Sequence, residues 1–243
     1  MVTNIFVTNI FKDRKDAGQF LAKRLTKYRN RDDVVVLAVP RGGVPVAYEV
    51  AKALSAPLDI FVVRKLGVPG FKEYAIGAIA SGGIRVLNEA LVSQLEIPLE
   101  VVDEVTAREF TELERQERLY RGARKSLDVT GKTVIIVDDG MATGSTMRAA
   151  VRALRKKDPR KIVIAVPLGE REVCNSFKQE VDTVIVCAMM PEPFNAVGTF
   201  YRHFAQTTDV EVQQLLRQVA DGKTALLSFR AAILPERVDA AVN

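Results

Sequence analysis

Five short apolar runs, rich in β-branched residues, recur along this chain, with an amphipathic segment between most neighbouring runs. Runs that are apolar throughout predict strands buried on both faces, as in a parallel sheet covered by helices. Their alternation with helical segments predicts an open α/β sheet flanked by helices. The expected strands are 34–39, 58–63, 133–137, 161–166 and 183–187.

The amphipathic segments predict the helices that cover this sheet. They fall at 14–29, 43–54, 89–122 with an interruption at Pro98, 144–157, 170–179 and 209–219. The helical stretch 89–122 reads as an insertion with a solvated charged face, although a partner-binding or dimer helix is left open. The Gly-rich stretch 67–88 has a hairpin-like pattern. We expect one domain over 1–220, with this insertion and a small hood at 188–204, and a tail at 221–243.

Composition narrows the class of protein. Of the 243 residues, 48% are hydrophobic and 27% are charged, close to a soluble domain and unlike a disordered or membrane chain. No leader-like start or membrane-length apolar run is present, so we expect a cytoplasmic protein. Two distant cysteines and the single His203 do not form the usual zinc site and fit a reducing compartment. A net charge of +5 suits an anionic ligand at least as well as a nucleic acid.

The segment 134–146, VIIVDDGMATGST, carries the strongest chemical signal. It predicts a buried strand, the acids Asp138 and Asp139 at its end, a loop of small residues and a helix start. In open α/β sheets, ligands bind beyond the carboxyl ends of the strands. Backbone N–H groups at a helix N-terminus favour a phosphate, whereas two carboxylates beside it favour a sugar diol or a hydrated cation. Ser145 stands where a P-loop needs lysine, and no G-x-G-x-x-G follows the first strand.

This segment resembles the phosphoribosyl-pyrophosphate (PRPP) signature of the type I phosphoribosyltransferases. The resemblance spans about residues 10–217 and implies a Rossmann-like fold with a small hood. It implies that Asp138 and Asp139 hold the ribose 2′- and 3′-hydroxyls. The loop implied to bind the 5′-phosphate consists of Ala142, Thr143, Gly144, Ser145 and Thr146.

Two further motifs strengthen the resemblance. The sequence PRGG, with Arg41, Gly42 and Gly43, follows the first expected strand and is similar to the family's pyrophosphate loop. Arg64 and Lys65 end the next expected strand, so we expect two cations on the same side of the sheet, where the family binds pyrophosphate. The residues implied to be catalytic are Asp138, Asp139, Arg64 and Lys65.

The hood segment would cover the acceptor through Phe194, Val197 and Tyr201. His203, just beyond it, is expected to be structural or solvent-facing. Hypoxanthine-guanine members carry an aspartate at the position of Ala142, so a general acid or base here would come from elsewhere, with Glu73 the nearest candidate.

The resemblance implies transfer of the phosphoribosyl group of PRPP to a nitrogenous, nucleobase-like acceptor with release of pyrophosphate. Mg²⁺ would bind through the substrate, with Asp138 and Asp139 as its only candidate protein ligands. A catalytically silent PRPP or nucleotide sensor is the alternative. A homodimer is expected from the family. Basic residues between 148 and 161 follow helical spacing, which favours a solvated helix face over a nucleic-acid surface.

Overall fold

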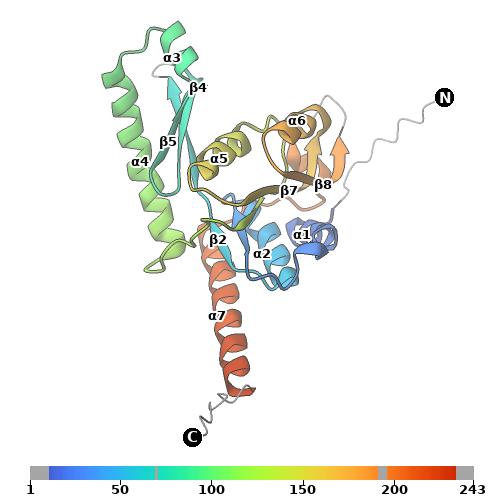
Figure 1. Ribbon diagram of the computed structural model, residues 1–243. Coiled ribbons are helices and arrows are strands. Elements are labelled where there is room, and N and C mark those ends of the chain that lie inside the picture. Colours follow the sequence, from blue (N-terminus) through green and yellow to red (C-terminus); the bar gives the residue numbers. More distant parts are fainter. Residues whose placement is uncertain (1–10, 69–70, 191–195, 234–243) are drawn as a thin grey trace, which may run out of the picture.

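The computed structural model describes residues 11–68, 71–190 and 196–233. At its centre lies a five-stranded sheet in the order β2–β1–β6–β7–β8, with every neighbouring pair parallel (Figure 1). This arrangement confirms the expected open parallel sheet. The strands are β1 (Val34–Ala38), β2 (Leu58–Ile60), β6 (Thr133–Val137), β7 (Lys161–Glu170) and β8 (Thr183–Met190).

Helices cover both faces of the sheet, with α5 and α6 above it and α1 and α2 below it in Figure 1. Successive side chains of a strand point to opposite faces. Val34 and Val36 of β1 therefore join the core cluster beneath the sheet, whereas Val35 and Leu37 join the cluster above it. The helices are α1 (Arg14–Arg24), α2 (Gly43–Leu54), α5 (Ser145–Arg155) and α6 (Arg171–Ser176), with the 3-10 turns η1 (Thr26–Tyr28), η2 (Phe177–Gln179) and η3 (Val197–Phe200).

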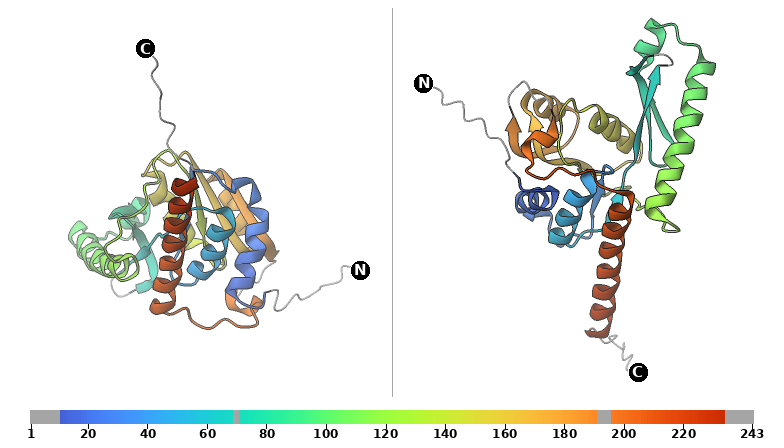
Figure 2. Two further views of the ribbon diagram at one scale, coloured as in Figure 1. Left: turned by 90° about the horizontal axis from the view of Figure 1, so that it is seen from below. Right: turned by 180° about the vertical axis from the view of Figure 1, so that it is seen from behind.

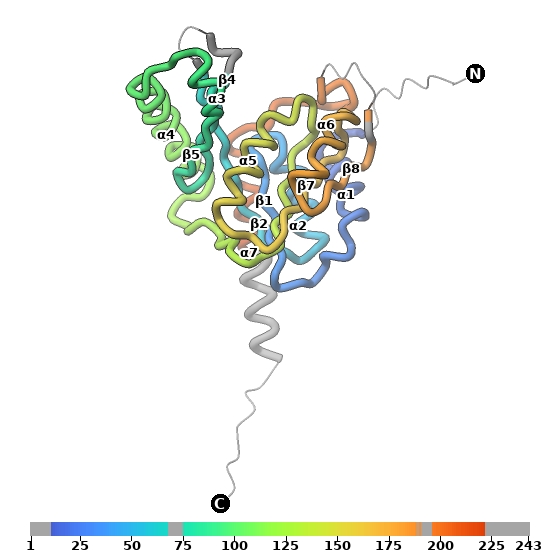
Figure 3. The backbone as a smooth tube through the Cα atoms, turned by 45° about the horizontal axis from the view of Figure 1, so that its top comes forward, coloured from blue at the N-terminus to red at the C-terminus, as the bar shows by residue number. Residues whose placement is uncertain are grey.

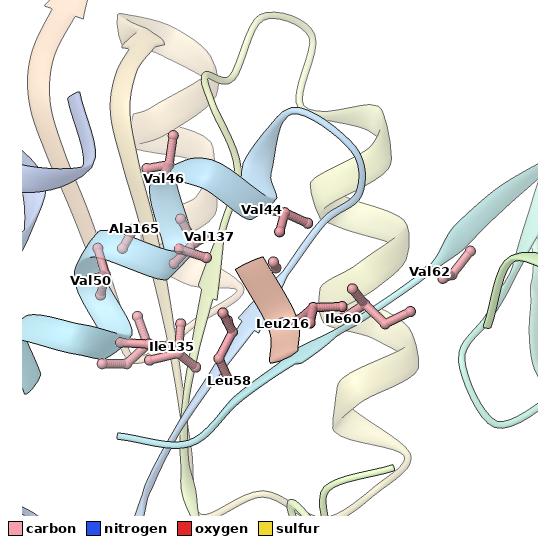
Figure 4. Packing of buried hydrophobic residues seen from close by; sticks show 14 of the residues in the cluster. Val44, Val46, Val50, Leu58, Ile60, Val62, Ile135, Val137, Ala165 and Leu216 are labelled. Carbon is pink, nitrogen blue, oxygen red and sulfur yellow. The ribbon is translucent and has the colours of Figure 1, made fainter. Parts of the chain in front are cut away.

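The helix α7 (Asp209–Ile233) closes the lower face at β2. Figure 4 shows its Leu216 beside Leu58 and Ile60 of β2, in the same cluster as Ile135 and Val137 of β6. The helix continues past residue 219, where the expected helix stops, and past the boundary expected between 220 and 221.

A second, antiparallel sheet stands beside the first and is clearest from behind (Figure 2). It comprises β3 (Val63–Val68), β4 (Phe71–Ala80) and β5 (Ile84–Leu87), followed by α3 (Glu89–Gln94) and α4 (Leu99–Arg121). The helix α4 packs on β3 and β4, and buried side chains such as Val105 and Leu113 share one cluster with Leu66, Ile76 and Ile79. The helical insertion expected at 89–122 is thus present, on a sheet of its own.

The prediction of a single strand at 58–63 is wrong. The strand β2 ends at Ile60, and β3 begins at Val63 in the other sheet. Between them, Phe61 N–H still donates to Ala38 O (2.8 Å), but Val62 N–H donates to Ser81 Oγ (2.8 Å) at the end of β4. Because both sheets bury this stretch, the sequence stays apolar from the end of β2 to the start of β3. No polar residue therefore marks the boundary between the two strands. Arg64 and Lys65 consequently lie on the antiparallel sheet.

A buried ion pair ties the insertion to the parallel sheet. Arg121, at the end of α4, donates from Nε to both carboxylate oxygens of Asp59 in β2, at 3.0 and 3.1 Å. Asp59 is only 6% exposed and also accepts from Leu127 N–H at 3.0 Å.

Along the chain ranges that the structure describes, no helix is sufficiently long and apolar to traverse a lipid bilayer.

Close packing of α1 on α2 depends on Gly18. A Cβ added there would lie 2.7 Å from Val46 O and 2.9 Å from Glu49 Cβ. We predict that Gly18→Ala lowers the free energy of unfolding by about 1–3 kcal/mol, because overpacking outweighs the roughly 1 kcal/mol that alanine adds to a helix. Urea unfolding measures this change. Lys15→Ala, on the exposed face of α1, serves as the control and should change stability by at most ~0.5 kcal/mol.

Candidate active site

The two predicted ligand loops meet at the carboxyl ends of β1 and β6. These strands are paired in register, Ala38 opposite Val137, so the loops that follow them start side by side. A Cβ added at Gly43 would lie 2.8 Å from Val137 O and 2.9 Å from Asp138 Cα, and one added at Gly42 would overlap the Asp139 carboxylate. The glycines of PRGG are therefore required for close approach to the aspartates, and the structure brings the two motifs into contact.

The paired aspartates are partly buried and electrostatically unfavourable as anions. Burial raises the pKa of Asp138 well above its usual range, and the neighbouring Asp139 carboxylate raises it further. Burial also raises the pKa of Asp139, although the Arg14 guanidinium opposes that shift. Asp138 Oδ1 accepts a hydrogen bond from Asp139 N–H at 2.8 Å. A ligand offering hydroxyl donors or a cation would relieve this unfavourable charge.

Arg14 contacts the candidate site, although the sequence offered no reason to assign it a role there. Its Nε donates to Asp139 Oδ2 at 2.8 Å, with both side chains at most 15% exposed. Its Nη1 donates to Ala205 O at 2.7 Å, and its guanidinium lies 3.8 Å from the centre of the Phe204 ring. Arg14 thus links α1, the predicted ribose site and the chain after η3. The two partners are 125 residues apart in sequence, so no local pattern signals the pair.

The predicted 5′-phosphate loop leads directly into the start of α5. Gly144 has φ +68°, in the left-handed region that favours glycine. Thr143 and Ser145 are exposed, and their hydroxyl oxygens lie 3.1 Å apart. The loop is fixed to β7, since Met141 N–H donates to Leu168 O at 3.0 Å and Glu170 N–H donates to Met141 O at 2.9 Å. Backbone N–H groups at a helix start favour an anion, so the predicted phosphate-binding role of this loop stays a prediction.

Part of the predicted hood lies against these loops. A Cβ added at Gly140 would lie 2.6 Å from Val197 Cγ1, so Val197 sits directly on the turn after the aspartates. The Tyr201 hydroxyl donates to Asp139 O at 2.5 Å, and burial raises its pKa. Phe194 lies outside the described residues. His203 is exposed, as expected.

Arg64 and Lys65 do not project together from the edge of the parallel sheet. They occupy successive positions of β3, opposite Ile79 and Ala78, so their side chains leave on opposite faces. Arg64 pairs with Glu109 of α4 at 2.7 Å, whereas Lys65 lines a pocket beside α5. The expectation of two cations on one side of the sheet is therefore wrong. Their pyrophosphate-binding role stays a prediction.

The third predicted pyrophosphate cation, Arg41, also faces a carboxylate. Its Nη1 lies 3.5 Å from Asp209 Oδ1 at the start of α7, and the Tyr120 hydroxyl donates to the same oxygen at 2.6 Å. This contact joins the PRGG loop to α4 and α7. The Pro40–Arg41 peptide bond is cis.

Three further features bear on the chemistry of this site: the two cysteines, Glu73 and the arrangement of possible metal ligands. Burial raises the pKa of both Cys174 and Cys187 to about 11, so neither thiol is ionised at neutral pH. Glu73, the weak acid–base candidate, falls within β4. No group of three or more His, Cys, Asp or Glu side chains within the described ranges is placed to hold a metal ion.

A family model described as the phosphoribosyl transferase domain matches residues 7–69 and 67–199. The chain belongs to this family. The match confirms the resemblance found in the PRPP signature and includes the PRGG loop and both aspartates.

The relatives extend this result without fixing an acceptor. A Mycobacterium tuberculosis protein named "Putative phosphoribosyl transferase Rv0571c" is 46% identical over 207 residues, 85% of this chain and 46% of its own length. The chain thus spans about half of that relative. The structure of TT1426 from Thermus thermophilus is similar with a TM-score of 0.76 and 36% identity, over 86% of this chain and 98% of that one. The "Bifunctional protein PyrR" of Actinobacillus pleuropneumoniae is 38% identical over 87 residues, 35% of this chain and 49% of its own length.

The raised pKa of Asp138 predicts a pH-dependent stability cost. Between the usual carboxyl pKa near 3.9 and the raised value, the folded state binds more protons than the unfolded state, so stability falls as pH rises. Asp138→Asn keeps an acceptor for Asp139 N–H and removes the charge. We expect a higher Tm than wild type at pH 7, by about 2–4 °C for each kcal/mol gained. The difference should vanish near pH 3, and calorimetry across this range would contradict the assignment if it stayed constant.

Proposed function

We propose that this protein is a PRPP-dependent phosphoribosyltransferase acting on a nitrogenous, nucleobase-like acceptor. One observation carries the proposal: Gly42 and Gly43 of the PRGG loop lie against the paired carboxylates of Asp138 and Asp139. The paired acids suit the two ribose hydroxyls, and the start of α5 suits the 5′-phosphate. The PRGG backbone, beside the aspartates, suits the pyrophosphate. The family membership of the chain supports the same assignment.

In the proposed reaction, the acceptor nitrogen forms a bond to C1 of PRPP as the bond to pyrophosphate breaks. The aspartates would orient the ribose for in-line attack. Donors of the PRGG loop and nearby cations would stabilise the charge that grows on the leaving pyrophosphate. Asp138 and Asp139 would be the residues to hold Mg²⁺, which prefers carboxylate oxygens, and such an ion would supply further charge stabilisation. Val197 and Tyr201, packed on the same turn, would help to cover the acceptor.

A second candidate, a PRPP- or nucleotide-sensing regulator without turnover, is favoured by a separate observation. Several cations near the site are already paired with carboxylates: Arg41 with Asp209 and Arg64 with Glu109. Asp139 Oδ2 is likewise already paired with Arg14. Turnover would require some of these pairs to be shared or broken by substrate, whereas ribose and 5′-phosphate binding alone would require fewer changes. The partial match to a bifunctional PyrR is compatible with either role.

Calorimetric titration with PRPP and Mg²⁺ tests both candidates. We predict that Asp138→Asn with Asp139→Asn weakens PRPP binding by about 100-fold or more, since two charge-assisted contacts at about 1.5–3 kcal/mol each are lost. The control removes two exposed carboxylates outside the site, Asp32→Asn with Asp158→Asn, and should bind as wild type. Thermal unfolding confirms that all variants are folded. Wild-type affinity in the double site variant would refute the diol assignment.

Turnover is tested separately by pyrophosphate release. The wild-type protein is incubated with PRPP, Mg²⁺ and each of a panel of purine and pyrimidine bases. We expect release with at least one base, and loss of that release in the Asp138→Asn with Asp139→Asn variant. PRPP binding without release for any base would replace the enzyme with the sensor.

A further inference from the structure

A basic pocket lies between the antiparallel sheet and α5, apart from the aspartates. Its volume is about 310 Å³, and three cations line it: Lys65 of β3 with Arg148 and Arg152 of α5. Figure 3 shows α5 lying between β5 and α6, so the pocket is on the side of α5 that faces the small sheet. We propose that this pocket is a second ligand site, which binds a small phosphomonoester with an apolar or aromatic body.

The charge of the pocket points to an anion. Among the residues whose side chains the structure describes, no carboxylate lines the pocket. Across the described ranges, the side chains of Lys65 and Arg152 make no hydrogen bond or ion pair within the protein, whereas those of Arg64 and Arg155 each pair with an acid. Like charges gathered in one concavity without counter-ions repel one another and raise the local concentration of anions. A bound phosphate would neutralise this excess and accept charge-assisted hydrogen bonds from Lys65 and Arg152.

Arg148 is held through its guanidinium by residues of α6 and the end of η2, on the other side of α5 from the small sheet. Its Nε donates to Glu180 Oε1 at 2.8 Å, and its Nη2 donates to Ser176 Oγ at 2.9 Å. Its guanidinium also lies 4.7 Å from the centre of the Phe177 ring. Glu180 offsets one positive charge, which leaves Lys65 and Arg152 as the uncompensated pair.

The other lining residues limit which chemical group can be attached to the phosphate. Val86 and Leu87 of β5 and Ala149 of α5 supply an apolar wall. A volume of about 310 Å³ is at the lower end of the range for small-molecule sites, about 300–1,000 Å³. A phosphate joined to a single sugar and ring matches both the size and the mixed lining. Free phosphate would leave the apolar wall unused.

The pocket is separate from the proposed PRPP site. Neither aspartate lines it, nor do Arg14, Gly42 or Gly43. Two of its lining residues were also predicted to contact PRPP, namely Ser145 of the 5′-phosphate loop and Lys65. The inference rests on the pocket alone and does not require that the protein transfer phosphoribosyl groups.

Calorimetry with adenosine and uridine monophosphates as probes, at physiological ionic strength, tests the proposal. Ala149→Leu fills the pocket without changing its charge, and Arg152→Gln removes one cation. Each should weaken binding of at least one probe by about tenfold or more, Arg152→Gln because one charge-assisted contact is lost and Ala149→Leu because its side chain occupies the space of the ligand. The matched control, Arg155→Gln, changes the same charge on the same helix outside the pocket and should bind as wild type. Thermal unfolding checks that every variant is folded.

A competition experiment distinguishes this site from the PRPP site. With PRPP and Mg²⁺ at saturation, probe binding should persist at the pocket. The proposal is overturned if no probe binds, if Ala149→Leu and Arg152→Gln bind as wild type, or if PRPP fully displaces the probe. If the protein does not bind PRPP at all, the proposed function fails, but the comparison of Ala149→Leu and Arg152→Gln with Arg155→Gln still decides the pocket.

Discussion

The contact between the PRGG loop and the paired aspartates is the constraint on which the rest of the site depends. It exists because β1 and β6 are neighbours in a parallel sheet and end at the same level, Ala38 opposite Val137. Only residues without a Cβ fit at positions 42 and 43. The same junction sets the start of α2, places Arg14 of α1 against Asp139 and fixes the turn on which Val197 packs. A shift of one strand relative to the other would separate every ligand group at once.

The parallel sheet was largely predictable, because strands buried on both faces must be apolar along their whole length. The strands β1, β6, β7 and β8 all follow from that pattern, and the PRPP signature marks the edge of the sheet where ligand binding is predicted. The change of sheet after Ile60 was not predictable in the same way. The stretch 58–63 is nearly all apolar, yet its ends belong to different sheets. Hydrophobicity reports burial but not the identity of the neighbouring strand.

The charged partners of the site were also beyond sequence reasoning. Arg14 and Asp209 lie far along the chain from the motifs that they contact, and each is one charged residue in an ordinary amphipathic helix. Which carboxylate an arginine meets depends on how helices pack on the finished sheet. Similarly, alternation along β3 sends Arg64 to α4 and Lys65 towards α5. Motifs with a local backbone requirement were found, and long-range ion pairs were not.

Two of the contacts that tie the helical insertion to the rest of the protein involve a carboxylate. Arg121 holds the buried carboxylate of Asp59, and Tyr120 shares Asp209 with Arg41 of the PRGG loop. A shortened chain that joined β5 directly to β6 would leave Asp59 buried without its cation and release the contact that restrains Arg41. Deleting the helical insertion would therefore remove both of these contacts. A shortened version of this protein would need other residues to replace them.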